Sequence, residues 1–448
     1  MSNKFDIVII GGGNAGFGVS AVASEAGKTI AFVEEWDFGG TCPNRGCTPK
    51  KVLVAAAHAL HEIELASVHG IDVGKPKLDW AKLIDRETDM IDFIPDAMAG
   101  VAEKRGTVFR GHAKFVGPNS IDVDGTILEA DNIVIATGSK PRALPIPGAE
   151  LMITSDEVLL EREQPGSVVF VGGGVIAMEF SHVYARAGTD VTILEALPQL
   201  LPRLDSDAVA AIQGETERIG VTVKTGVKVN EIRKDGGKLA VEFEHEGKTH
   251  NVSADRVVNG AGRVANVDTL DLEAGNVKHD RVAVDVDAHL CSTSNPSVWV
   301  CGDALVTSPQ LSPLATYEGR IVGKNIVEGP VETPDYSVVP NCVYTVPALA
   351  NVGLTEAEAK EKGMKVKATI NDMTGWFSGK AYGETVAFSK ILVDEDSDQI
   401  VGAQMVGHNG EELIQLFAFA MTHGITASQI KSTPTAFPTF SSDVKNLF

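Results

Sequence analysis

The chain has few cysteines, and their placement limits what they can do. Its 448 residues include only Cys42, Cys47, Cys291, Cys301 and Cys342. Five irregularly spaced cysteines cannot form the disulfide framework of a secreted protein, so we expect a cytoplasmic location and a catalytic role for any Cys42–Cys47 bond. No second Cys/His pair occurs at the spacing of metal ligands, so a zinc half-site is disfavoured and no metal site is predicted.

The sequence also lacks the features of membrane and nucleic-acid proteins. No run of about 20 apolar residues occurs, so no transmembrane helix is expected. The N-terminal stretch KFDIVIIGGG has neither a basic region nor a small-residue cleavage site, which predicts a buried strand rather than a signal peptide. The formal net charge of −21 disfavours binding to nucleic acid or to an anionic membrane surface.

Length and composition otherwise indicate an ordinary globular protein. Hydrophobic residues make up 44% of the chain and charged residues 22%, which is typical of such proteins. Because domains usually hold about 100–200 residues, a chain of 448 residues is expected to form about three.

Two copies of one mononucleotide-binding pattern organise the sequence. A strand at 5–10 leads into the turn GGGNAG (11–16), a helix to about residue 26 and a strand ending at Glu34. A strand at 167–171, the turn GGGVIA (172–177), a helix at 178–187 and a strand ending at Glu195 repeat the pattern. The glycines let the backbone approach a pyrophosphate, and the acid can bond a ribose hydroxyl. We therefore expect two dinucleotide sites on two doubly wound domains.

Acidic residues at strand ends suggest what these sites hold. Glu195 can accept a hydrogen bond from a free ribose 2′-hydroxyl and would repel a 2′-phosphate, and neither Ala196 nor Leu197 offers a cation for that phosphate. NADH is therefore preferred, with NADPH possible. A further buried strand at 297–300 ends at Asp303, which suits a ribityl or ribose hydroxyl of a bound cofactor.

The segment GGTCPNRGCTPKK (39–51) holds the reactive residues. Cys42 and Cys47 are separated by four residues, and a helix-favouring run extends from residue 50 to about 66. Cys47 should lie near the helix N-terminus, where the dipole favours a thiolate. Two thiols so placed suit reversible disulfide exchange.

The remaining chain predicts a third, different domain. Residues 50–110 look mainly helical, and strands are expected at 111–116, 120–123, 131–136, 221–223, 239–244 and 256–259. From about residue 334, short strands at 343–345, 385–393 and 399–406 alternate with helices at 355–362 and 411–423. This α+β domain has no phosphate loop, so an interface role is expected.

Together these motifs resemble those of the FAD-dependent pyridine nucleotide–disulfide oxidoreductases, the group of dihydrolipoamide dehydrogenase, glutathione reductase and mercuric reductase. The further matching motifs are IATGSKP (135–141), GAGR (260–263), VWVCGDA (298–304), VYTVPALANVGLTEAEA (343–359) and GEELIQLFAFAM (410–421). The resemblance implies an α/β homodimer with two Rossmann-like domains and a C-terminal α+β dimerisation domain. The implied boundaries are 1–150 with 264–333 for FAD, 151–263 for NAD(P) and 334–448 for dimerisation.

The resemblance also implies roles for individual residues. NADH reduces FAD, which passes electrons to the Cys42–Cys47 disulfide and on to a small disulfide or another soft electrophile. Cys47 acts as the charge-transfer thiolate and Cys42 as the interchange thiol, while Lys50 or Lys51 lies beside the flavin and pairs with Glu179. The implied FAD contacts are Gly11, Gly13, Gly16, Glu34, Gly40, Thr41, Lys51, Ala113, Thr137, Gly138 and Asp303. The implied nicotinamide nucleotide contacts are Gly172, Gly174, Ile176, Glu179, Glu195 and Gly262.

The C-terminal segment AFPTFSSD (436–443) departs from the family pattern. The family has a histidine, then Pro-Thr, and a glutamate five residues after the histidine, a dyad that reaches in from the partner subunit and shuttles protons. Phe437 and Ser442 occupy these two catalytic positions. Because phenylalanine transfers no proton and acid–base help is worth about 10²–10⁴-fold, ordinary turnover should be slow unless Asp443, His58 or His61 substitutes.

Other activities stay open alongside disulfide reduction. Phenylalanine at 437 resembles 2-oxopropyl-coenzyme M reductase/carboxylase, which cleaves a thioether and fixes CO2, although that enzyme has a histidine where this chain has Ser442. The chain ends KNLF without the C-terminal cysteine pair of mercuric reductase, which disfavours that route of metal reduction. Quinone or metal reduction by another route, or a flavin-binding subunit with little turnover, are the remaining alternatives.

Overall fold

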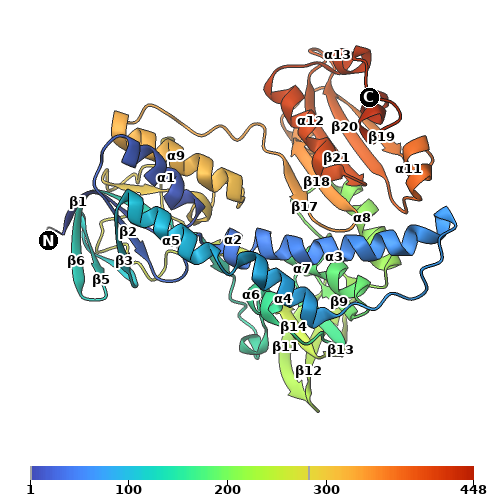
Figure 1. Cartoon of the computed structure of the whole chain (residues 1–448), viewed down its shortest axis with the longest axis horizontal. Coiled ribbons are helices and arrows are strands. Elements are labelled where there is room, and N and C mark those ends of the chain that lie inside the picture. The colour runs from blue at the N-terminus through green and yellow to red at the C-terminus, as the bar shows by residue number, and fades with distance from the viewer. Residues whose placement is uncertain (1–2, 281–282) are drawn as a thin grey trace. The chain divides into compact units, whose positions relative to one another are not determined.

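The structure is a computed structural model that describes residues 3–280 and 283–448 (Figure 1). It divides into two compact units. Unit 1 comprises Met1–Lys50, Asp85–Arg142 and Arg263–Tyr336. Unit 2 comprises Lys51–Ile84, Ala143–Gly262 and Ser337–Phe448.

Unit 1 is built on a seven-stranded sheet in the order β3-β2-β1-β6-β5-β4, with β16 also paired to β6. Its central strands are parallel and carry the apolar run of the N-terminus into the core, whereas β4, β5 and β6 form an antiparallel edge. The strands are β1 (Lys4–Ile10), β2 (Ile30–Glu34), β3 (Thr107–Arg110), β4 (Ala113–Gly117), β5 (Ser120–Val123), β6 (Thr126–Ile135) and β16 (Val298–Val300). A separate antiparallel pair joins β7 (Ser139–Pro141) and β15 (Arg263–Ala265).

Helices α1 (Asn14–Glu25) and α9 (Ser312–Glu328) lie side by side in unit 1 (Figure 1). Glycine permits the close approach, because a Cβ on Gly319 would meet the carbonyl oxygen of Ala15 and a Cβ on Gly18 would lie 2.6 Å from that of Thr316. The other helical segments of this region are α2 (Thr41–Arg45), α4 (Trp80–Ile91), α5 (Ile94–Arg105) and η3 (Gly302–Ala304).

The first part of unit 2 repeats the parallel arrangement. Its four-stranded sheet has the order β10-β9-β8-β14, and a three-stranded antiparallel sheet β11-β12-β13 follows β10 in the chain. The strands are β8 (Ser167–Val171), β9 (Asp190–Leu194), β10 (Thr222–Lys224), β11 (Lys228–Asp235), β12 (Lys238–His245), β13 (Lys248–Ala254) and β14 (Arg256–Asn259). The helical segments are α3 (Cys47–Leu65), which begins in unit 1, η1 (Ala66–His69), η2 (Ala149–Leu151), α6 (Ser155–Leu160), α7 (Val175–Arg186) and α8 (Ser206–Arg218).

The C-terminal part of unit 2 is an antiparallel five-stranded sheet in the order β17-β18-β21-β20-β19. Helix α12 covers it, packing on β18 and β21. The strands are β17 (Asn341–Val343), β18 (Ala348–Gly353), β19 (Val366–Asp372), β20 (Phe388–Asp394) and β21 (Ile400–Gly407). The helical segments are α10 (Glu356–Glu361), α11 (Phe377–Tyr382), α12 (Gly410–Thr422), α13 (Ala427–Ser432), α14 (Phe440–Asp443) and η4 (Val444–Asn446).

Most expected elements are present with shifted ends, and the fold class predicted from the sequence is confirmed. Both glycine-turn helices begin earlier than expected, at Asn14 and Val175, so that the last residues of each turn are already helical. The strand expected at 343–345 instead ends at Val343. Within residues 3–280 and 283–448, no helix is both long and apolar enough to cross a membrane.

Candidate active site

The cysteine pair lies where two helices follow each other in unit 1. Cys42 is in the first turn of α2, and α3 begins at Cys47, as the sequence predicts. Gly46 closes the turn between them, since a Cβ there would lie 3.0 Å from the carbonyl oxygen of Thr41. Cys47 is exposed and Cys42 is half-buried. This geometry places two sulfurs and a helix N-terminus together.

The thiol of Cys42 has a lowered pKa. A hydrogen bond from Cys47 lowers the pKa of Cys42 to about 6, with help from the hydroxyl of Ser312 and the backbone N–H of Cys47, against burial and the negative charge of Asp303. The sequence predicts a helix-stabilised thiolate at Cys47. In the structure, the backbone N–H of Cys47 at the start of α3 is hydrogen-bonded to the sulfur of Cys42. A thiolate is therefore available near neutral pH on the cysteine that precedes the helix.

The first glycine turn forms a tight clasp around Glu34. The backbone N–H of Gly12 donates to Glu34 Oε2 at 2.6 Å, and that of Trp36 donates to Oε1 at 2.8 Å. Gly11 has φ +111°, and a Cβ there would collide with the carbonyl oxygen of Ala136. Gly13 is the capping residue of α1, and a Cβ there would lie 3.7 Å from the Cα of Gly40. Because Gly13 has no side chain, its N–H and the helix N-terminus can meet a phosphate.

The second glycine turn repeats these contacts one by one. Glu195 Oε2 accepts from the N–H of Gly173 and Oε1 from that of Leu197 at 2.7 Å, while Gly172 has φ +105°. Gly174 caps α7, as Gly13 caps α1. Two further residues are predicted to contact the nicotinamide nucleotide. Ile176 is half-buried in α7, and Gly262, directly before β15, borders open space. The two clasps thus have equivalent backbone geometry.

Polar groups gather at the end of β6 and β16 in unit 1. Asp303 lies in η3, where its Oδ2 accepts from Ser139 Oγ at 3.0 Å, and burial raises its pKa. The hydroxyl of Thr137 is buried and has no hydrogen-bond partner, and the adjacent Gly138 borders open space. A hydroxyl with an unused hydrogen-bonding capacity fits a polar ligand such as FAD at this place.

The remaining predicted FAD contacts lie around the clasp of unit 1. Gly40 precedes α2, and Thr41 is its first residue. Ala113 is buried at the start of β4 and follows His112, whose Nδ1 lies 3.0 Å from Glu35 Oε2 next to Glu34. These segments therefore converge on the same clasp from three parts of the chain.

The two lysines after Cys47 have different surroundings. Lys50 is buried. Lys51 Nζ lies 3.7 Å from Glu411 Oε1 and 3.9 Å from the centre of the Tyr344 ring. The N–H of Tyr344 donates to Glu179 Oε1 at 2.8 Å, so Lys51 and Glu179 contact the same residue.

Neither Phe437 nor Ser442, the two predicted C-terminal site residues, lies where it could act as a general acid or base. Phe437 is 76% exposed. Ser442 is buried, and it forms a capping box with Thr439 at the start of α14, in which its hydroxyl donates to the Thr439 carbonyl oxygen at 2.6 Å. The hydroxyl of Ser442 is therefore committed to holding the segment.

The histidines considered as substitutes have lowered pKa values. Burial lowers the pKa of His61 to about 4 and also lowers that of His58. Two useful groups escaped the sequence-based prediction. Ser312, which contacts Cys42, and His408, paired with Glu384, lie 270 and 24 residues from their partners, and no local motif marks them.

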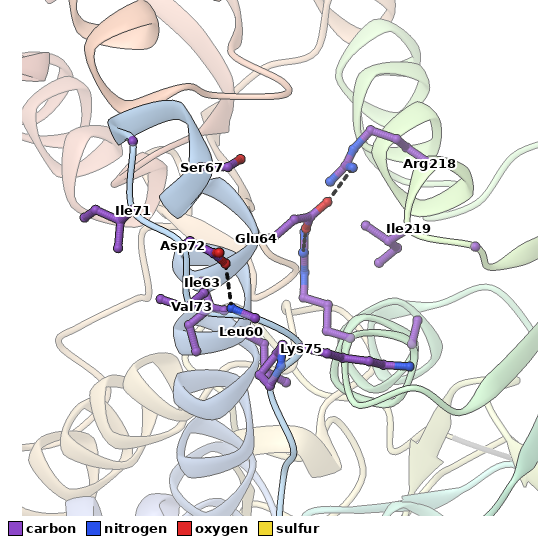
Figure 2. Close-up of a pocket in the computed structure, with 16 residues that line it drawn as sticks. Leu60, Ile63, Glu64, Ser67, Ile71, Asp72, Val73, Lys75, Arg218 and Ile219 are labelled. Carbon is purple, nitrogen blue, oxygen red and sulfur yellow. Dashed lines mark hydrogen bonds and ion pairs between the residues drawn. The ribbon is translucent and has the colours of Figure 1, made fainter.

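A cavity of about 850 Å³ lies elsewhere in unit 2 (Figure 2). None of the predicted site residues lines it. Its arginines are already paired, since Arg218 Nη1 donates to Glu64 at 2.7 Å and Arg186 Nη2 to Glu215 at 2.9 Å. Across the described parts of the chain, no group of three or more His, Cys, Asp or Glu side chains could hold a metal ion.

Comparison with known proteins identifies the family. Residues 5–319 match the model of the pyridine nucleotide-disulphide oxidoreductases, and residues 339–448 match the dimerisation domain of that family. The dihydrolipoyl dehydrogenase of Cupriavidus necator is 34% identical over 94% of this chain and 92% of its own, and that of Bacillus subtilis is 31% identical over 98% and 96%. The structure of the HOCl-induced flavoprotein disulfide reductase RclA from Escherichia coli matches with a TM-score of 0.87 at 26% identity, over 99% of both chains.

These relatives confirm the predicted FAD and NAD(P)H cofactors and the predicted oxidoreductase activity toward a disulfide. The chain belongs to the pyridine nucleotide-disulphide oxidoreductase family and carries that family's dimerisation domain.

Proposed function

We propose that this flavoprotein is a cytoplasmic homodimer that uses NADH to reduce a small disulfide or another soft electrophile through Cys42 and Cys47. The observation that carries the proposal is the lowered pKa of Cys42 beside the thiol of Cys47. A thiolate near neutral pH is the nucleophile that attacks a disulfide sulfur. This supports Cys42 as the interchange thiol, with Cys47 toward the flavin.

The roles of the cofactor-binding residues follow from the two clasps. In the proposed assignment, the turn at 11–16 with Glu34 and Asp303 holds FAD in a domain of 1–150 and 264–333, and the turn at 172–177 with Glu195 holds the nicotinamide nucleotide in a domain of 151–263. Bound FAD supplies the two-electron relay between NADH and the thiols. Residues 334–448 form the dimer contact, and the partner subunit completes the active site.

The position of Glu195 supports NADH as the preferred donor. Both of its oxygens are bonded by backbone N–H groups at the tip of β9, which keeps the carboxylate where a ribose 2′-hydroxyl would lie. A 2′-phosphate would meet this negative charge with no arginine at the two following positions. Lys50, which is buried near the start of α3, is assigned as the lysine beside the flavin, and Lys51 lies against Glu411 and Tyr344.

Anaerobic titration of the holoenzyme with NADH tests the electron path. We expect a long-wavelength charge-transfer band between Cys47 and the flavin, and we expect Cys47→Ser to abolish it while Cys291→Ser leaves it intact. The same enzyme should turn over with NADH faster than with NADPH. A band that is missing from the wild type, or that persists in Cys47→Ser, would refute the assignment of the redox pair.

Two observations keep a second activity under test. Exposed Phe437 brings no proton carrier, which favours chemistry that must avoid protonation, such as thioether cleavage with CO2 fixation. A structural relative at 27% identity is described as a Cu(II) complex of RclA, which favours testing the reduction of a metal ion. Incorporation of labelled bicarbonate with thioether substrates tests the first activity, and NADH oxidation with Cu(II) and quinones tests the second. Either activity is supported if its rate exceeds the rate with disulfides.

A further inference from the structure

Two helices of unit 1, α1 and α9, begin side by side at polar residues. Asn14 is the first residue of α1, and Ser312 is the first residue of α9. The amide nitrogen Nδ2 of Asn14 donates a hydrogen bond to Ser312 Oγ. The starts of the two helices are therefore joined directly, although 298 residues separate them in the chain.

Close packing of the two helices holds this contact in place. A Cβ on Gly18 would lie 2.6 Å from the carbonyl oxygen of Thr316, and a Cβ on Gly319 would collide with that of Ala15. Because backbone meets backbone at both places, the two helices have a close-packed and well-defined register. The first residues of both helices therefore extend from backbone positions that are fixed relative to each other.

The hydroxyl of Ser312 also reaches the proposed nucleophile. It is hydrogen-bonded to the sulfur of Cys42, next to the hydrogen bonds from Cys47. The titratable groups that act on Cys42 are Cys47 at the start of α3 and Asp303 in η3, and the negative charge of Asp303 opposes a thiolate. A hydroxyl donor at this sulfur therefore offsets both burial and a nearby carboxylate.

The chemistry of the two side chains sets the direction of their hydrogen bonds. A carboxamide nitrogen carries two N–H donors and no acceptor, whereas a hydroxyl has one donor and two lone pairs. Ser312 Oγ must therefore accept from Asn14, which leaves its single proton for a second partner. The sulfur of Cys42 is such a partner, and it gains most as a thiolate, because hydrogen bonds to charged groups are the stronger ones.

We propose that Ser312 and Asn14 are positioning residues for the nucleophile, with Asn14 orienting the Ser312 hydroxyl so that its proton is donated to the thiolate of Cys42. The inference rests on the proposed function, in which Cys42 attacks a substrate disulfide. In that step the substrate S–S bond breaks as a bond forms between Cys42 and one of its sulfurs, and the other sulfur leaves as a thiolate. Asn14 belongs to the glycine turn 11–16 assigned to FAD, so one segment serves the cofactor and orients the nucleophile.

Alkylation of Cys42 in the reduced holoenzyme tests this contact. Trypsin cleaves after Arg45, so Cys42 and Cys47 fall on different peptides and mass spectrometry follows each separately. In the wild type, the initial rate of alkylation by iodoacetamide should be half-maximal near pH 6. Ser312→Ala removes the donor and should raise this midpoint by about one pH unit, whereas Ser312→Thr keeps a hydroxyl and should leave it near the wild-type value.

A double-mutant cycle distinguishes orientation from general damage. Asn14→Ala frees the hydroxyl to turn away from the sulfur, so it should raise the midpoint in the wild type. It should have no further effect in Ser312→Ala, because the proton that Asn14 orients is then absent. Ser24→Ala is the matched control, since its hydroxyl lies in the same helix as Asn14 but is bonded to the carbonyl oxygen of Ala21, and it should leave the midpoint unchanged.

An unmoved midpoint in Ser312→Ala, or an equal shift in Ser312→Thr or Ser24→Ala, would overturn the inference. An Asn14→Ala shift that persists at full size in the Ser312→Ala background would also overturn it. If Ser312→Ala does not fold, Asn14→Ala decides alone, and an unmoved midpoint there refutes the role of Asn14.

Reduction by tris(2-carboxyethyl)phosphine makes the alkylation measurement independent of NADH. A wild-type enzyme that forms no charge-transfer band with NADH would instead refute the proposed function, so the two failures are distinguishable.

Discussion

Hydrogen bonds from Cys47 lower the pKa of the neighbouring thiol of Cys42. Sequence spacing predicts a helix N-terminus at Cys47, and α3 does begin there. The donors at that terminus nevertheless serve the neighbouring sulfur, and the thiol of Cys47 adds the largest effect on the pKa of Cys42. For the pKa of a thiol, the direction of a nearby N–H therefore matters more than the distance of the cysteine from the helix end.

The reactivity of Cys42 should therefore titrate well below an ordinary thiol. In the reduced enzyme, alkylation of Cys42 by iodoacetamide should reach half its maximal rate near pH 6, because the thiolate predominates above the pKa. Cys47→Ala removes the donating thiol and should shift the midpoint to higher pH. Mass spectrometry of the Cys42 peptide measures both, with Cys342 as an internal reference, and an unchanged midpoint would contradict this account.

Residues of the candidate site were predictable where the chemistry is local in sequence. Glu34 and Glu195 follow from a glycine turn and a fixed spacing, and the clasps are present at both places. Ser312 was not predictable, because only folding brings α9 to Cys42. Glu384 was missed for a similar reason, since its partner lies beyond the whole of β20 and β21.

Helices pack closely where glycine removes side chains. In unit 1, Gly18 of α1 and Gly319 of α9 bring the two backbones together, and this pair supports the helix that carries the first clasp. Close packing of this kind tolerates no added volume, because neighbouring backbone cannot move aside as a flexible side chain would.

Alanine substitutions in two helices should therefore have opposite effects on stability. Gly319→Ala places a Cβ against the backbone of Ala15 and should lower the free energy of unfolding by about 1–3 kcal/mol. Gly214→Ala, in α8 with no atom nearby, should raise it by about 0.5–1 kcal/mol through helix propensity. Thermal unfolding of both holoenzymes measures the difference, and a loss of stability in both would count against the packing argument.

The sequence predicted the fold class correctly, but it predicted some strands and missed others. The parallel strands β8 and β14 appear with the expected ends, since continuous β-branched runs mark buried strands. Strands β18 and β19 were missed. The first is a short run, buried along most of its length, that includes Asn351 and ends at Gly353, so it shows no alternation of polar and apolar residues. Strands β11 and β13 are largely polar edges around β12 and lack an apolar signal.

Assembly acts at the scale of the whole molecule. The family's dimerisation domain spans residues 339–448, and α12 within it carries exposed Leu416 and Phe419 on one face, three residues apart. Large exposed apolar side chains in such a domain are the expected anchors of a subunit interface.

Phe419→Glu should therefore weaken the dimer and, with it, turnover. A buried charge in an apolar contact is costly, so the variant should dissociate at protein concentrations at which the wild type stays dimeric. Sedimentation velocity measures the change, and Val116→Glu on the edge strand β4 is a matched control at 47% exposure. If Phe419→Glu remained dimeric across the dilution series, α12 would lie outside the interface.

The twin clasps around Glu34 and Glu195 have a consequence for redesign. Each has two equivalent backbone donors and a positive φ at its first glycine, so this shared geometry does not distinguish a flavin dinucleotide from a nicotinamide dinucleotide. The two turns are therefore interchangeable, and the segments around them must determine whether a flavin or a nicotinamide dinucleotide is bound. A chimera that exchanges only the two turns should keep its original cofactors in their original domains.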